Sequence, residues 1–193
     1  MWRKQAFLNA GTNFRAKVFG KKSNQISVVP WNDKTEAKFH NMQMQLHNLF
    51  IEELSTYSND RCKAGNPVVV FDERTNKFMR ATIVSVKSSC WQVDLIDTGE
   101  TLNVKLNELF PLYQKHTTIF EVLPMAYHCL IMSVVATTDE TDSTASASAS
   151  LLPPTSDQLA MIKRGTILHV TTMATAESEY PSQNVLVRLE SSN

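Results

Sequence analysis

The chain has 193 residues, of which 42% are apolar and 20% charged, the composition of a globular protein long enough to bury one large core or two small ones. Its apolar runs are far shorter than the roughly 20 residues that a membrane-spanning helix needs, and residues 1–22 lack the apolar segment of a secretory signal. The formal net charge of zero disfavours a dedicated nucleic-acid binder, which usually carries a basic excess.

The N-terminal part of the chain predicts a β-hairpin followed by a helix. Residues 14–18 and 26–30 alternate apolar and polar side chains on either side of a polar turn. Asp33, with Glu36 three residues later, resembles a helix N-cap and its partner. A helix is therefore expected over 34–54, where apolar residues recur at helical spacing: Phe39, Met42, Leu46, Leu49 and Phe50.

The middle of the chain predicts a succession of short strands. The expected strands span residues 68–71, 79–87, 91–96 and 101–106. Polar loops separate them, and Asp97, Thr98 and Gly99 can make a tight turn in which glycine supplies the positive φ. Strands this short and closely spaced suggest a small, strongly bent barrel.

The C-terminal part predicts a further strand over 126–135, then a helix near 157–163 and two strands over 166–172 and 185–189. Residues 137–156 are rich in Ser, Thr and Ala with acidic residues and a Pro-Pro pair, so we expect a flexible loop there. The three cysteines, Cys62, Cys90 and Cys129, include no CxxC pair. They fit a reducing compartment, which favours a cytoplasmic protein without a disulfide framework.

Four stretches of the chain, taken in order, resemble the core of a Tudor domain. They are residues 68–71, 78–81, 93–99 and 109–112. In that family the second strand typically carries an aromatic pair followed by Arg-Ala, and the third ends in Asp-Tyr-Gly-Asn. The equivalents here are Phe78-Met79-Arg80-Ala81 and Asp97-Thr98-Gly99-Glu100. The hairpin, helix and strands around this core resemble the split staphylococcal-nuclease-like half of an extended Tudor domain, so the resemblance covers nearly the whole chain.

The resemblance implies a mainly β fold with a linking α-helix, in which a Tudor barrel is inserted into an oligonucleotide-binding-like (OB-like), staphylococcal-nuclease-like barrel. The expected segments are 1–56 for the first part of the OB-like half with the linking helix 34–54, 57–122 for the Tudor core, and 123–193 for the second part with the flexible loop 137–156.

Family members commonly bind symmetrically dimethylated arginine in an aromatic cage and lay the flanking peptide along the seam between the two halves. The cage-equivalent positions here are Phe71, Met79, Leu95, Thr98 and Glu100, of which only Phe71 is aromatic. Methylation removes hydrogen-bond donors from arginine but keeps its charge. An acidic acceptor at 100, in place of the family's Asn, suits an arginine that still has all its donors, so we expect recognition independent of methylation.

Other residues are expected to support this pocket. Asp72, Asp94 and Asp97 would add negative potential, and Met79 and Leu95 would form an apolar floor. Plainer interpretations remain open: Phe71 as a core residue, Glu100 as a solvated carboxylate, Met79 and Leu95 as packing residues, and Asp97 as a residue that shapes its turn.

Extended Tudor proteins often act in the germline piRNA pathway, where they bind Arg-rich tails of PIWI-clade Argonautes in perinuclear granules (nuage). The resemblance therefore implies a non-catalytic adaptor for such a tail, with self-association through other regions left open. The alternatives are a single-stranded RNA-binding OB-like module and a self-association scaffold with an inactive Tudor pocket. RNA is disfavoured because no row of aromatic residues interleaved with basic ones is visible in the OB-like half.

No catalytic residue, cofactor or metal site is expected. His40 and His47 share a face of the predicted helix, but no third ligand lies at a convincing spacing. The basic residues of the nuclease-like half are dispersed, without the acidic cluster that phosphodiester cleavage would need: Arg15, Lys17, Lys163, Arg164 and Arg188.

Overall fold

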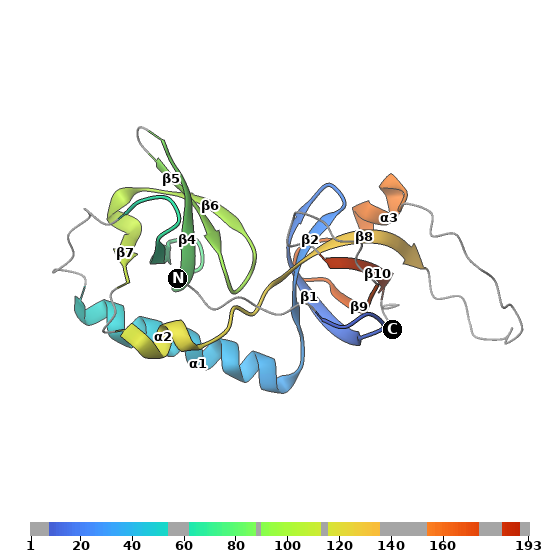
Figure 1. The fold of residues 1–193 in the computed structure, drawn as a ribbon, viewed down its shortest axis with the longest axis horizontal. Helices are drawn as coiled ribbons and strands as arrows, with labels where there is room; N and C mark the ends of the chain where they lie inside the picture. Colours follow the sequence, from blue (N-terminus) through green and yellow to red (C-terminus); the bar gives the residue numbers. More distant parts are fainter. Residues whose placement is uncertain are drawn as a thin grey trace, which may run out of the picture. The chain divides into compact units, whose positions relative to one another are not determined.

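The computed structural model describes residues 8–53, 62–87, 90–112, 116–135, 154–173 and 183–189. The chain divides into two compact units (Figure 1). The Tudor unit holds the described residues of Asn32–Ala126, and the barrel unit holds those before Asn32 and after Ala126. The Tudor unit is thus inserted, in sequence, into the barrel unit, which confirms the predicted fold class. No helix within these described ranges is long and apolar enough to cross a membrane.

The barrel unit is a closed barrel of five strands drawn from both ends of the chain. Its strands are β1 (Asn13–Lys22), β2 (Gln25–Pro30), β8 (Tyr127–Val135), β9 (Ile167–Thr172) and β10 (Gln183–Leu189), in the spatial order β1-β2-β8-β10-β9. Neighbouring strands are antiparallel except β8 and β10, which run parallel. The predicted hairpin and the predicted C-terminal strands are therefore confirmed.

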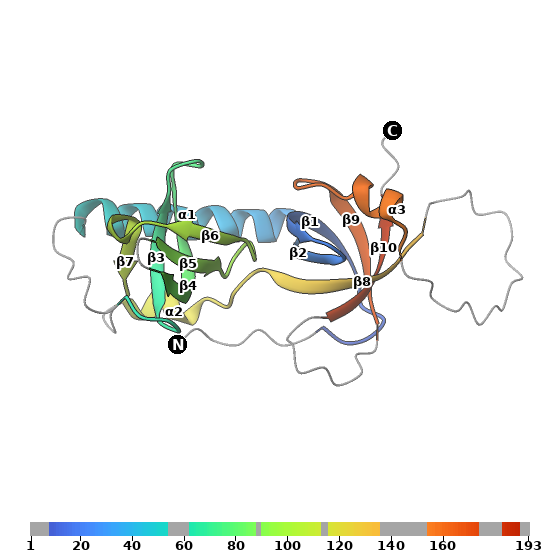
Figure 2. The ribbon, with the colours of Figure 1, turned by 90° about the horizontal axis from the view of Figure 1, so that it is seen from above.

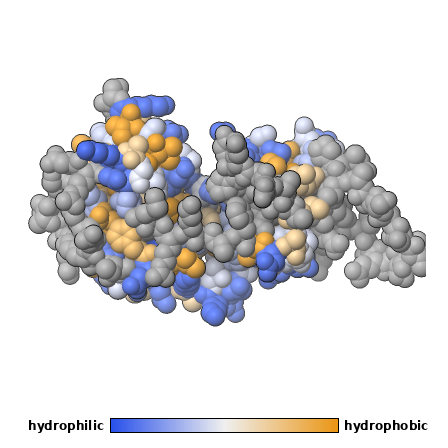
Figure 3. Space-filling view, in the orientation of Figure 1, coloured by the Kyte–Doolittle hydropathy of each residue, from blue (hydrophilic) through white to orange (hydrophobic). Residues whose placement is uncertain are grey.

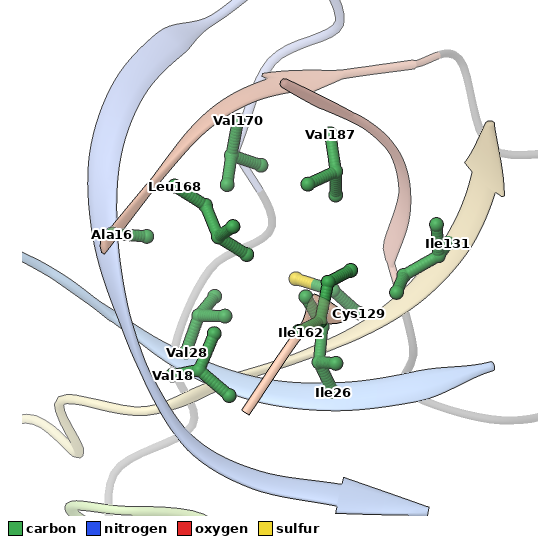
Figure 4. Close-up of a cluster of buried hydrophobic side chains, with 10 residues drawn as sticks. All are labelled: Ala16, Val18, Ile26, Val28, Cys129, Ile131, Ile162, Leu168, Val170 and Val187. Atoms are coloured by element: carbon green, nitrogen blue, oxygen red, sulfur yellow. The ribbon is translucent and has the colours of Figure 1, made fainter. Parts of the chain in front are cut away.

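Alternate residues of these strands fill the interior of the barrel (Figure 4). The buried cluster consists of the strand residues Ala16, Val18, Ile26, Val28, Cys129, Ile131, Leu168, Val170 and Val187, together with Ile162 from the segment before β9. Burial raises the pKa of the Cys129 thiol to about 12, so this cysteine stays protonated at neutral pH and packs as a small apolar residue.

A short helix, α3 (Ser156–Met161), precedes β9. Thr155 starts it with a capping box: its hydroxyl accepts the Gln158 backbone N–H, and the Gln158 side chain accepts the Thr155 backbone N–H. Most of the predicted loop 137–156 lies outside the described residues. Its last residue, Ser156, is helical because the capping box begins the helix there.

The Tudor unit is built on a curled five-stranded sheet in the order β6-β5-β4-β3-β7. Its strands are β3 (Pro67–Asp72), β4 (Lys77–Lys87), β5 (Cys90–Leu95), β6 (Thr101–Val104) and β7 (Leu109–Pro111). Gly99 adopts a φ of 70° in the turn after β5, as predicted. Sequence patterning missed β7 and the 3-10 turn η2 (Leu106–Glu108) before it, because three residues are too short to show a period.

The predicted helix is present as α1 (Asp33–Glu53), and it packs against β4 (Figure 2). Its first turn is capped by Asn32, not by Asp33 as expected: Asn32 Oδ1 accepts the Thr35 backbone N–H at 2.9 Å. Phe50 of α1 lies 6.0 Å from Phe78 and 5.9 Å from Phe110, centroid to centroid. This ring packing groups α1 with the Tudor unit. The sequence-based prediction had assigned the helix to the OB-like half.

Candidate functional site

Three of the five cage-equivalent residues, Phe71, Met79 and Leu95, lie on the neighbouring strands β3, β4 and β5 but on different faces of the Tudor sheet. Met79 and Leu95 belong to the buried cluster inside the curled sheet and are 5% and 1% exposed. Val70 belongs to the same cluster, so the alternation of a strand turns the next residue, Phe71, to the opposite face. There the Phe71 ring lies 5.0 Å from the Phe78 ring. The structure thus separates Phe71 from Met79 and Leu95.

Met79 and Leu95, which were expected to form an apolar floor for the ligand, are buried and so cannot contact one. Leu95 is enclosed by the sheet interior. Met79 is covered by Gln43 of α1, whose Nε2 donates a hydrogen bond to the Met79 sulfur at 3.0 Å. Both side chains therefore serve as packing residues in this structure, because their surfaces are already in contact with the protein.

The turn after β5 carries the other two cage-equivalent residues. Thr98 is 2% exposed, and its Oγ1 has no hydrogen-bond partner among the described residues, which is uncommon for a buried hydroxyl. Glu100 is half-buried, and its backbone carbonyl accepts the Leu95 N–H at 2.8 Å. Glu100 is therefore the more accessible of the two side chains on this turn.

Asp97, expected to support the pocket, is instead part of a buried ion pair. Arg80, whose side chain is fully buried, donates Nε to Asp97 Oδ2 at 2.8 Å and Nη2 to Oδ1 at 2.5 Å. The remaining guanidinium donors reach three backbone carbonyls at the end of α2 (Thr117–Glu121) and just beyond it: Ile119, Val122 and Leu123. The charge of Asp97 is therefore neutralised inside the unit and adds little attraction for a ligand.

Asp72 is engaged by an arginine of its own turn. Arg74 donates Nε to Asp72 Oδ1 at 3.0 Å and Nη2 to Oδ2 at 3.1 Å, and Thr75 Oγ1 donates to Oδ2 at 3.1 Å. Burial alone would raise the pKa of Asp72, but these hydrogen bonds and the Arg74 charge outweigh it and lower that pKa. The pKa of Arg74 is raised, chiefly by its hydrogen bond to Asp72 and further by the charge of Glu100.

Arg74 therefore lies in the field of two of the predicted acidic residues, Asp72 and Glu100. The third, Asp94 on β5, accepts a hydrogen bond from Thr101 Oγ1 at 2.7 Å and is half-buried. Sequence reasoning missed Arg74, because its contact with Asp72 depends on the conformation of the β3–β4 turn.

The lowered pKa of Asp72 predicts a pH-dependent contribution to stability. Above the ordinary pKa of 3.8, the ionised carboxylate stabilises the fold, and this stabilisation is lost as the pH falls through the lower folded pKa. Asp72→Asn should therefore lower the free energy of unfolding by about 1 kcal/mol at neutral pH and leave it unchanged near pH 2. Urea unfolding at both pH values would check this, and a difference that persists in acid would contradict it.

A second feature absent from the sequence reasoning is a pocket of about 210 Å³ between α1 and the start of β4. It is lined by Gln43, Met44, His47, Asn48, Asn76, Lys77 and Phe78. The view in Figure 3 shows hydrophobic and hydrophilic residues intermingled at the surface. Within the ranges that the structure describes, no group of three His, Cys, Asp or Glu residues is placed to hold a metal ion.

The Tudor domain family model matches residues 15–131. Because this match covers more than half of the chain, the chain belongs to the Tudor domain family, whose members are typically non-catalytic reader modules. A comparison with curated protein sequences finds no match.

The fold is that of an extended Tudor domain. The human TDRD1 extended Tudor domain, solved with a symmetrically dimethylated peptide, is similar with a TM-score of 0.70 at 18% identity, over 94% of this chain and 82% of that one. The Drosophila melanogaster Papi extended Tudor domain has a TM-score of 0.70 at 15% identity, over 94% and 91%. A single-residue variant of the Papi domain, solved with an unmethylated Piwi N-terminal peptide, has a TM-score of 0.68 at 12% identity, over 94% and 91%.

Proposed function

We propose that this chain is a non-catalytic adaptor that binds an Arg-containing peptide through its Tudor unit, independently of arginine methylation. The observation that carries the proposal is that the cage-equivalent positions include a carboxylate and only one aromatic ring. Glu100 presents a half-buried carboxylate, while Phe71 is the one aromatic residue of the set. Unmodified arginine has five N–H donors for a carboxylate, whereas a dimethylated one depends more on ring faces.

The peptide we propose is the Arg-rich N-terminal tail of a PIWI-clade Argonaute. The support is chemical and comparative: an arginine suits Glu100, and a structurally similar Papi domain is solved with a Piwi N-terminal peptide. In this role the chain supports assembly of the piRNA pathway in perinuclear germ granules of the cytoplasm. A short, flexible peptide must be ordered on binding, so the affinity is modest, on the order of 1 to 100 μM. Several domains or self-association would supply avidity.

Titration calorimetry of the whole chain against such a peptide, unmodified and symmetrically dimethylated, tests this function. We expect the unmodified peptide to bind at least as tightly as the dimethylated one, because each N–H that the arginine retains can donate a hydrogen bond to the carboxylate. A clear preference for the dimethylated form would overturn methylation independence. If neither form binds, the peptide-adaptor function is wrong, and a self-association scaffold or a nucleic-acid module takes its place.

A further inference from the structure

The outer face of the barrel unit gathers aromatic and basic side chains that lie apart in the sequence. Ala16 and Val18 point into the barrel core (Figure 4). The residues that alternate with them on β1, Arg15 and Lys17, therefore face outward. Trp31 follows β2 and is joined to β1 by a hydrogen bond from its backbone N–H to the Arg15 carbonyl at 2.8 Å.

Two aromatic rings and an ammonium group meet at this place. The Lys17 Nζ lies 4.1 Å from the centroid of the Trp31 ring, within the range of a cation–π interaction. The Phe19 ring lies 6.4 Å from the same ring. A register shift between Val18 and Gly20 marks a bulge at Phe19, which re-aims side chains on a strand. Both Phe19 and Trp31 are only partly buried.

The neighbouring strand adds a further nitrogen-bearing side chain. His169 of β9 is the register partner of Arg15 and is exposed. The residues on either side of it, Leu168 and Val170, point into the core (Figure 4). His169 therefore faces outward beside Arg15. We call Arg15, Lys17, Phe19, Trp31 and His169 the outer patch.

The outer patch itself carries two cationic side chains, those of Arg15 and Lys17, and no carboxylate. A positive surface with ring faces is the combination that single-stranded nucleic acids need, because phosphates meet the cations and bases stack on the rings.

We propose that the outer patch binds single-stranded nucleic acid. Bases stack on Trp31 and Phe19, while Arg15 and Lys17 contact the phosphates. The outer face of a small barrel is the surface that OB-folds use for oligonucleotides. An acidic peptide would satisfy the cations but would leave the two rings without stacking partners. The proposal concerns the barrel unit and is independent of the peptide function assigned to the Tudor unit.

Fluorescence anisotropy of the whole chain with fluorescein-labelled 20-mers of oligo(U) and oligo(dT) tests this proposal. We expect saturable binding whose log–log salt slope is about −1.4 for two phosphate contacts. The double variant Arg15→Glu/Lys17→Glu should weaken binding by about tenfold or more. Trp31→Leu should weaken it by about fivefold or more, whereas Trp31→Phe, which keeps a ring, should retain most of it.

The matched control is Lys34→Glu/Lys38→Glu, which makes the same change of charge at two exposed positions of α1. This control should bind oligo(U) like the unchanged chain. Equal loss in the control, or equal binding of a labelled oligo-glutamate peptide, would overturn the proposal, since the surface would then attract any polyanion. Absence of oligonucleotide binding by a chain with an unchanged circular dichroism spectrum would overturn it as well.

Discussion

Arg80→Met is expected to lower the free energy of unfolding by about 3–5 kcal/mol, the typical effect of breaking a buried ion pair. The substitution leaves the Asp97 carboxylate, 1% exposed, without its charged partner. It also removes the donors of three buried or half-buried carbonyls around the end of α2. Urea unfolding followed by circular dichroism would measure the change, with a second ion pair of the same sheet, whose arginine is exposed, as reference.

That reference is Arg74→Met, which removes the same side-chain type from the pair with Asp72. The Arg74 side chain is 56% exposed, whereas that of Arg80 is fully buried. Solvent screens a pair whose arginine is exposed, to about 1 kcal/mol, and Asp72 keeps the hydrogen bonds from Thr75 Oγ1 and the backbone N–H of residue 74. Arg74→Met should therefore be mild. The double variant Arg80→Met/Asp97→Leu should regain part of the loss, because no charge is then left buried. Equal effects of the two single Arg substitutions would contradict this account of Arg80.

The parts of the fold that have a clear periodicity could be predicted from sequence. Apolar residues recur about every second position in the hairpin of β1 and β2 and in the strands β3 to β6, and every three to four positions in the helix α1. The short elements β7, η2 and α2 could not, since three to five residues carry too little pattern. The assignment of α1 to the Tudor unit depends on the contact of Phe50 with Phe78 and Phe110, which spacing along the chain does not encode.

The candidate site divides in the same way. Its positions follow from the Tudor-like motifs, but the partners of its carboxylates do not. Asp97 is neutralised by a residue 17 positions away, and Asp72 by Arg74 within a turn that Asn76 closes with a φ of 53°. The outer patch shows the same limit, because the contact with Lys17 of β1 is made by Trp31, which follows the end of β2. Sequence patterns predict which face of a strand a side chain lies on. Its interaction partners depend on contacts between turns and strands that are distant in the sequence.

Opposite changes of affinity are expected from two substitutions at the proposed peptide site. Glu100→Ala should weaken binding of the unmodified Arg-rich peptide about tenfold, since a charge-assisted hydrogen bond contributes about 1.5–3 kcal/mol and half-burial leaves some screening. Arg74→Ala should strengthen binding about threefold. Arg74 is a cation that already interacts with the charges of Asp72 and Glu100. Its removal leaves a more negative potential at the site, which attracts the arginine of the peptide more strongly.

Glu73→Ala provides the matched control for both substitutions. Glu73 is exposed in the same turn, next to Arg74, so its removal changes the net charge as Glu100→Ala does. Calorimetry of the three variants with the unmodified peptide separates local recognition from overall charge. If Glu73→Ala weakens binding as much as Glu100→Ala, the attraction is general and Glu100 is not the arginine partner. If Arg74→Ala weakens binding, Arg74 contributes to holding the peptide instead of competing with it, and the arginine of the peptide must meet a different group.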